Sequence, residues 1–142
     1  MTLAIGLLAA VGLAISSYFT AVAYRWTPPN VRWIPSFCRL EERTCASVVF
    51  TPSARVFGPP NSLLGQVFYA ALLAGAASGR LADPHLWWLY LGVSLVTVGL
   101  GVYLSHALLF VLRVPCPLCF VSHGVNAVIC GLLLFLPHAG GW

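Results

Sequence analysis

Four long apolar runs constrain this chain more than any other feature of its sequence. They cover about residues 3–24, 62–79, 86–112 and 118–136, and none contains Asp, Glu, Lys or Arg. A helix needs roughly 20 apolar residues to cross the hydrocarbon core of a bilayer. Charged residues make up only 7% of the 142 residues, whereas a soluble domain carries about 25%. We therefore expect an all-α integral membrane protein, a four-transmembrane-helix bundle in which residues 1–142 form a single domain.

The longest connection, residues 25–61, joins the first two predicted helices. It mixes tryptophan and phenylalanine with arginine and proline. Tryptophan and arginine together are typical of the headgroup layer of a membrane. We expect this segment to form an amphipathic loop that caps the bundle.

The chain has five cysteines, and their spacing points to chemistry. Cys38 and Cys45 lie in the cap loop, Cys116 and Cys119 form a C-x-x-C sequence where the last apolar run begins, and Cys130 lies within that run. Two pairs and one spare thiol suggest two disulfides and one structural cysteine.

A C-x-x-C sequence alone is compatible with redox chemistry or with metal binding. The prolines around this pair fit the first turn of a helix, where a missing N–H is tolerated, and this setting favours a redox pair. The alternative is a small membrane metal-binding or transport protein that uses the four thiols as ligands. Structural zinc usually organises small soluble folds, so the membrane setting argues against it. A second alternative is a scaffold protein whose disulfides only stabilise the cap loop.

Polar residues follow Cys119 along one face of the last predicted helix. His123 lies at i+4 and Asn126 at i+7, and Cys130 follows at i+11. Polar groups inside a membrane helix are costly without partners. We interpret His123 and Asn126 as functional residues and Cys130 as a buried packing residue. Nothing in the sequence places His106 on this face.

Two dithiols at one end of a bundle suggest a relay of electrons by thiol–disulfide exchange. The Cys116–Cys119 pair must then transfer two electrons to an acceptor. At the edge of a bilayer, a lipid-soluble quinone is the natural acceptor. The seven arginines are scattered through loops and there is no lysine, so the sequence gives no support for nucleic-acid binding.

The chain resembles the vitamin K epoxide reductase family. The matching features are a loop cysteine pair after the first helix, then Arg55-Val56-Phe57-Gly58, Asn61-Ser62-Leu63-Leu64-Gly65, Val67-Phe68-Tyr69, and the late C-x-x-C followed by Asn126. The resemblance implies a four-helix bundle around a quinone of the ubiquinone or menaquinone type, and bacterial and archaeal members oxidise a thioredoxin-like partner.

Carried over by position, the resemblance gives each site residue a role. Cys38 would receive the partner's attack, Cys45 would exchange with Cys116, and Cys119 would face the quinone. Asn61 matches a residue expected to hydrogen-bond a quinone carbonyl. The family often has tyrosine at the position of His123, so we expect the quinone contact or the proton delivery to differ there. No thioredoxin domain follows Trp142, so we expect the partner to act in trans.

The distribution of arginine suggests an orientation in the membrane. Arginine excess marks the cytoplasmic side of short loops. Loops on the cysteine side hold six arginines and the opposite side holds only Arg80; the six are Arg25, Arg32, Arg39, Arg43, Arg55 and Arg113. In most family members the active-site cysteines face outward. The arginine bias of this chain instead favours cysteines that face the cytoplasm, as in inverted archaeal relatives.

Overall fold

The computed structural model describes residues 1–24, 58–81, 83–111 and 117–139. The predicted cap loop lies almost wholly outside these residues. Cys38, Cys45 and Cys116 lie outside them as well, so the arrangement expected for these three thiols stays a prediction.

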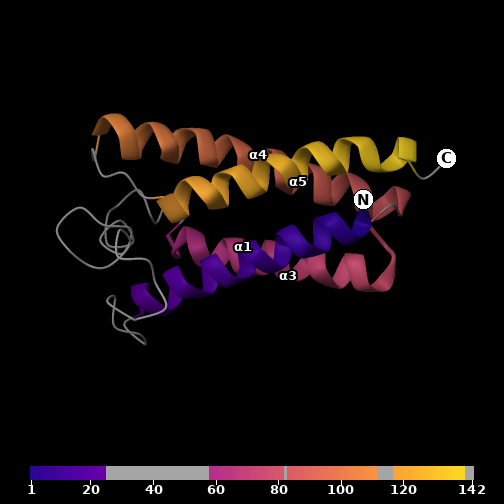
Figure 1. The fold of residues 1–142 in the computed structure, drawn as a ribbon, viewed down its shortest axis with the longest axis horizontal. Helices are drawn as coiled ribbons and strands as arrows, with labels where there is room; N and C mark the ends of the chain where they lie inside the picture. Colours follow the sequence, from indigo (N-terminus) through magenta and orange to yellow (C-terminus); the bar gives the residue numbers. More distant parts are fainter. Residues whose placement is uncertain (25–57, 82, 112–116, 140–142) are drawn as a thin grey trace.

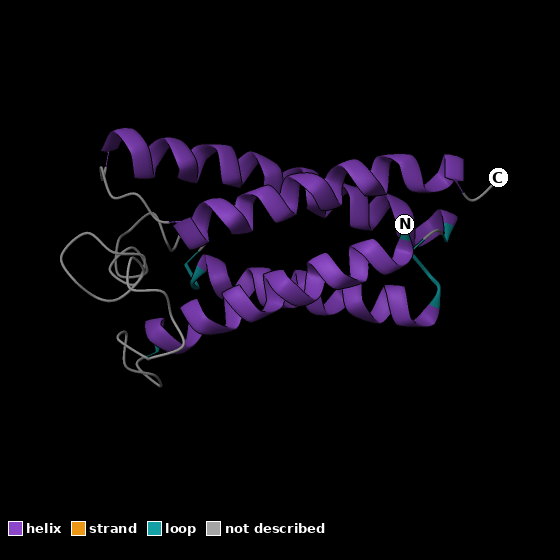
Figure 2. Ribbon diagram, viewed as in Figure 1, coloured by secondary structure: helices purple, strands orange, loops and turns teal. Residues whose placement is uncertain are grey.

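Four helices lie side by side and form the bundle (Figure 1). They are α1 (Thr2–Ala23), α3 (Asn61–Ser78), α4 (Pro84–His106) and α5 (Pro117–Ala139), and α4 continues as the short π-helix η3 (Ala107–Val111). Figure 2 shows only helices and short loops in the described part of the chain. The predicted all-α bundle is confirmed, and the predicted runs agree closely with the helix bounds.

Three of the described helical segments are long and apolar enough to cross a membrane: Thr2–Ala21, Pro84–Val111 and Cys119–Leu136. Helix α3 has 18 residues and carries Asn61, Ser62 and Gln66 in its first half. It packs along α1 over its length, so it lies within the same bundle. The protein is an integral membrane protein.

A tight turn joins α3 to α4 at one end of the bundle. Gly79 ends α3 with a left-handed backbone (φ 71°), a conformation that favours glycine. Asp83 caps α4 by accepting a hydrogen bond from the backbone N–H of His85 (2.9 Å), and Pro84 occupies the first helical position. Arg80 and Asp83, the charged residues of the described chain, both lie in or beside this turn.

The C-terminal end of α1 and the N-terminal ends of α3 and α5 meet at the opposite end of the bundle (Figure 1). The C-terminal end of η3 lies there too. Cys119 lies at this end, in the first turn of α5.

The hydrophobic core fills the half of the bundle near the α3–α4 turn. Side chains from all four helices pack there with almost no exposure, among them Ile5, Ala9, Leu72, Leu91, Ile129 and Leu133. We call this region the packed half, and the region between it and the Cys119 end the hollow half.

Candidate functional site

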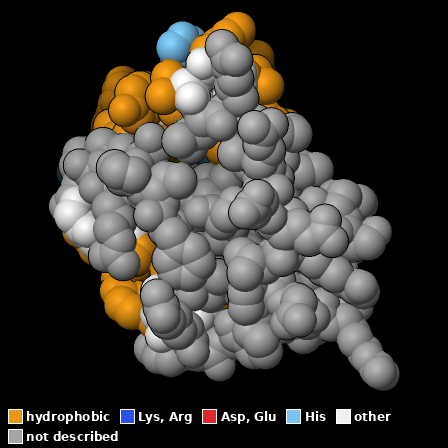
Figure 3. Space-filling view, turned by 90° about the vertical axis from the view of Figure 1, so that its left-hand side faces the viewer, with side chains coloured by type: hydrophobic (Ala, Val, Ile, Leu, Met, Phe, Trp, Pro, Cys, Tyr) orange, Lys and Arg blue, Asp and Glu red, His pale blue; other side chains and the backbone are white. Residues whose placement is uncertain are grey.

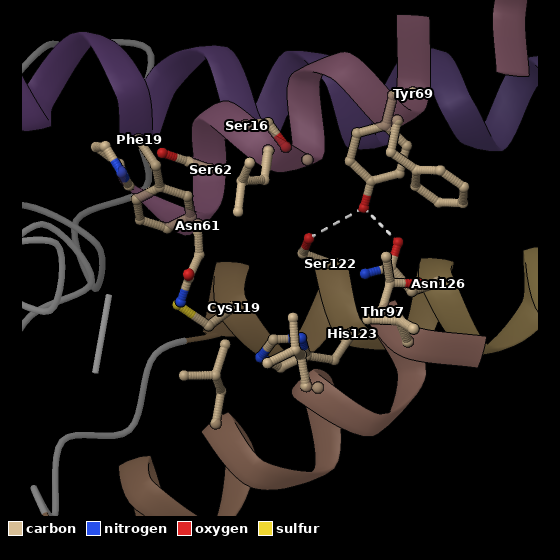
Figure 4. Close-up of a pocket in the computed structure, with 18 of the residues that line it drawn as sticks. Ser16, Phe19, Asn61, Ser62, Tyr69, Thr97, Cys119, Ser122, His123 and Asn126 are labelled. Carbon is tan, nitrogen blue, oxygen red and sulfur yellow. Dashed lines mark hydrogen bonds between the residues drawn. The ribbon is translucent and has the colours of Figure 1, made fainter. Parts of the chain in front are cut away.

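A cavity of about 270 Å³ occupies the hollow half (Figure 4). Every helix contributes to its wall. Its polar lining consists of Ser16, Asn61, Ser62, Tyr69, Thr97, Cys119, Ser122, His123 and Asn126. No Asp, Glu, Lys or Arg of the described residues lines it, so it suits a neutral ligand rather than an ion.

Asn61 and Cys119 lie together at the outer end of the cavity. Asn61 is the first residue of α3, directly after Pro60, and Cys119 lies in the first turn of α5. Their side chains point toward one another across the cavity mouth (Figure 4). A sulfur atom and a carboxamide therefore share one end of the cavity.

His123 lies one turn further along α5 and packs directly on Gly101 of α4. A Cβ atom placed on Gly101 would lie 3.2 Å from His123 Nδ1, which is tighter than ordinary contact. The lack of a side chain at Gly101 is what lets the imidazole fit between the two helices while its ring still lines the cavity.

A hydrogen-bonded cluster closes the inner end of the cavity. The Tyr69 hydroxyl of α3 donates to Asn126 Oδ1 (2.5 Å) and lies 3.4 Å from Ser122 Oγ; both partners belong to α5. Tyr69 is 2% exposed, at the boundary with the packed half. This cluster links the α1–α3 pair to α5 and gives Asn126 a fixed partner.

Polar side chains also hold α3 against α1 along the cavity. Thr20 donates to Ser62 (3.0 Å), and Gln66 donates to Ser17 (2.9 Å). Hydrogen bonds between membrane helices contribute about 1 kcal/mol each. They help to keep the N-terminal part of α3, with Asn61, in register with α1.

The cavity opens sideways between α3 and α4. Leu64, Val93 and Val96 line it and are also 39%, 39% and 55% exposed, respectively. Although α3 and α4 follow one another in the chain, α3 packs mainly on α1 and α4 packs mainly on α5. A shallow apolar groove on α4 that includes Trp88, Leu89 and Gly92 continues from Val93 and Val96. In a membrane this opening faces the lipid chains.

The π-helix η3 forms part of the outer rim. Ala107 and Leu108 are consecutive residues, yet both are buried and line the cavity. Single π-helical turns are often found at functional sites. His106 is exposed, contacts Phe110 through its ring and does not line the cavity. Among the described side chains that are visible from this end, most are hydrophobic and none is a Lys, Arg, Asp or Glu (Figure 3).

The cavity brings together four of the predicted site residues: Cys119, Asn61, His123 and Asn126. Cys130 is buried in the packed half, as the sequence indicated. Among the described residues, no cluster of three or more His, Cys, Asp or Glu could hold a metal. The remaining predicted site residues, Cys38, Cys45 and Cys116, lie outside the described residues.

Sequence reasoning gave no role in the site to Tyr69, Ser122 or Gly101, although Tyr69 lies in one of the motifs that carry the resemblance. Ser122 lies three residues after Cys119, on the same face of α5, and Tyr69 lies eight residues after Asn61, so helical spacing offered a weak signal. Their importance depends on which helices face one another, and the spacing within one helix does not specify this.

Taken together, a membrane-spanning helical bundle with a cysteine of a C-x-x-C pair at the mouth of its internal cavity defines a membrane protein with thiol chemistry. The chain belongs to the vitamin K epoxide reductase family, whose model matches residues 3–134. A search of curated proteins found no match. Family membership makes this protein a membrane thiol–disulfide oxidoreductase and does not favour the metal-binding alternative.

Proposed function

We propose that this protein generates disulfides by passing electrons from a thioredoxin-like partner to a quinone of the membrane. The partner's dithiol reduces the Cys38–Cys45 disulfide and leaves oxidised. The Cys38–Cys45 dithiol then reduces the Cys116–Cys119 disulfide by exchange. Finally the Cys116–Cys119 dithiol loses two electrons and two protons as its S–S bond reforms, and the quinone takes both pairs and leaves as a quinol.

The observation that carries this proposal is the shared cavity of Cys119, Asn61, His123 and Asn126. A quinone headgroup is a flat, neutral ring with carbonyl oxygens that accept hydrogen bonds. Carboxamide and imidazole N–H groups are suitable donors, and the surrounding wall is apolar. The opening between α3 and α4 gives a lipid-soluble molecule a route from the bilayer.

The residues of the cavity have different roles in this proposal. Asn61 holds a quinone carbonyl near the Cys119 sulfur, so that the thiol and the ring meet without crossing water. His123, beside Cys119, holds a proton that the ring needs when it becomes a quinol. The departure from tyrosine at this position changes the donor from a phenol to an imidazole.

Trapping of the partner tests the first transfer. With Cys45→Ala, the free Cys38 thiolate should displace thionitrobenzoate from a single-cysteine thioredoxin-like protein that carries this leaving group. The resulting mixed disulfide should accumulate, because no Cys45 thiolate is present to resolve it. The matched variant Cys38→Ala should trap nothing. If both variants trap equal amounts, or neither traps any, the assignment of Cys38 as the entry point is wrong.

We also propose that the cysteines face the cytoplasm, on the basis of the arginine distribution. In intact cells of the Cys45→Ala variant, in which Cys38 is a free thiol, a membrane-impermeant maleimide should leave Cys38 unlabelled, and lysis should expose it to the reagent. Labelling of Cys38 in intact cells would show the opposite orientation.

A further inference from the structure

The Tyr69–Ser122–Asn126 cluster lies at the end of the cavity opposite Cys119. The cavity therefore has polar groups at both ends, and Val93, Val96 and Leu100 form an apolar part of the wall between them, alongside His123 and Thr97. Figure 4 shows the open space between the Cys119 sulfur and the Tyr69 hydroxyl. A ligand that matches this pattern has an acceptor at both ends and an apolar middle.

We propose that Asn126 binds the second carbonyl oxygen of a para-quinone, and that Tyr69 is the positioning residue that sets the Asn126 amide for this contact. The inference rests on the proposed function, since it requires that a quinone occupies the cavity. It adds that the ring lies along the α5 axis, with one carbonyl at Asn61 and the other at Asn126.

The spacing of the two ends fits a para-quinone. Asn61 faces Cys119, and Asn126 follows Cys119 by seven residues, so the backbone positions at the two ends of the cavity are about 10.5 Å apart along the α5 axis. The two oxygens of a para-quinone lie about 5 Å apart across the ring. A hydrogen bond of about 2.9 Å at each end extends this to about 11 Å between the two partner atoms. An ortho-quinone has both oxygens on one side of its ring and cannot reach both ends.

The hydrogen bond from Tyr69 decides which atom Asn126 presents to the cavity. Because Asn126 Oδ1 accepts from the Tyr69 hydroxyl, the two N–H donors of the amide remain for a ligand. Figure 4 shows the amide nitrogen of Asn126 turned toward the interior of the cavity. Without the hydroxyl, the amide can rotate and place its own oxygen against the quinone oxygen, which would repel it.

The position of Tyr69 is itself fixed by α1. A Cβ atom on Gly12 would overlap the Tyr69 ring, so the ring lies directly against the α1 backbone. A phenol held this firmly loses little further entropy when the ligand binds. Tyr69 is therefore suited to orienting Asn126, and its hydroxyl remains in contact with Ser122 and Asn126.

The test compares Tyr69→Phe with Tyr90→Phe, whose hydroxyl donates to Ala71 O and does not line the cavity. The measurement is steady-state reduction of ubiquinone with a short side chain by a reduced thioredoxin-like protein. Loss of one oriented hydrogen bond should raise KM about tenfold in Tyr69→Phe with little change in kcat. Tyr90→Phe should match the wild type, and an unchanged KM in Tyr69→Phe would overturn the inference.

A double variant separates positioning from simple destabilisation. If Tyr69 acts through Asn126, then Tyr69→Phe should add nothing to the loss already caused by Asn126→Leu. Additive losses would contradict a positioning role.

Ring isomers give a measurement on the wild type alone. We expect para-naphthoquinone to be reduced with a KM at least about tenfold below that of ortho-naphthoquinone. Equal KM values would overturn the inference even if Tyr69→Phe failed to fold. A wild type that reduces neither quinone would overturn the proposed function, and this inference with it.

Discussion

The two halves of the bundle are built from the same four helices but serve different ends. In the packed half, aliphatic side chains such as Ile5, Leu72 and Leu133 interlock with almost no exposure. In the hollow half, the same helices turn Ser16, Asn61 and Asn126 toward a cavity. We therefore expect stability to depend mainly on the packed half and chemistry on the hollow half, so substitutions in the two halves should have separable effects.

The largest effect should come from comparing a cysteine in each half. Cys119→Ala removes the sulfur at the cavity mouth, so quinone reduction should fall by about a thousandfold or more. Cys130→Ala removes a buried sulfur from the packed half and should leave the specific rate of folded protein unchanged. Quinone-coupled oxidation of a thioredoxin-like protein measures the rate of both variants. A comparable loss of rate in Cys130→Ala would contradict the proposed difference between the two halves.

A pair of histidines offers the next contrast. His123→Ala removes a group that lines the cavity, and quinone turnover should fall about a hundredfold, the lower end of the roughly 10²–10⁴-fold that a positioned proton donor contributes. Exchange between the cysteine pairs, followed by thiol labelling, should stay intact. His106→Ala, at an exposed position outside the cavity, is the control and should behave as the wild type; an equal loss there would contradict the role of His123.

Stability should respond most in the packed half. Leu133→Ala leaves a void among fully buried side chains and should cost about 2 kcal/mol or more of unfolding free energy. Its neighbour Leu134 is 46% exposed, so Leu134→Ala should cost much less. Unfolding in detergent measures both, and similar losses would mean that the packed half is not the main source of stability.

The smallest effect should come from crowding the cavity through its wall. Gly101→Ala places a methyl group within 3.2 Å of His123 Nδ1, so the imidazole must move and quinone turnover should fall a few-fold. Gly99→Ala lies on the same helix with nothing within 4 Å of its added Cβ. It controls for the gain in helix propensity, and equal rates in the two variants would argue against a fixed position for His123.

Much of this arrangement could be predicted from sequence because it depends on properties local to each helix. Charge-free runs marked the helices, and spacing along α5 placed Cys119, His123 and Asn126 on one face. The structure then showed that Asn61, from another helix, lines the same cavity. The roles assigned to these residues remain predictions.

Features that depend on contact between helices could not be predicted in this way. The hydrogen bond from Tyr69 to Asn126 joins residues 57 positions apart. The fit of His123 against Gly101 needs the register of α4 on α5, and the π-turn at Ala107–Val111 has no marker in a uniformly apolar run. A sequence pattern specifies which face of a helix is unusual, but not which neighbour meets it.

Photolabelling with an azido-quinone tests most directly whether the hollow half holds the quinone beside Cys119. The account predicts crosslinks within residues 61–69 and 119–126, and excess unlabelled quinone should suppress them. Crosslinks that persist under competition, or that lie within residues 129–136 of the packed half, would contradict it.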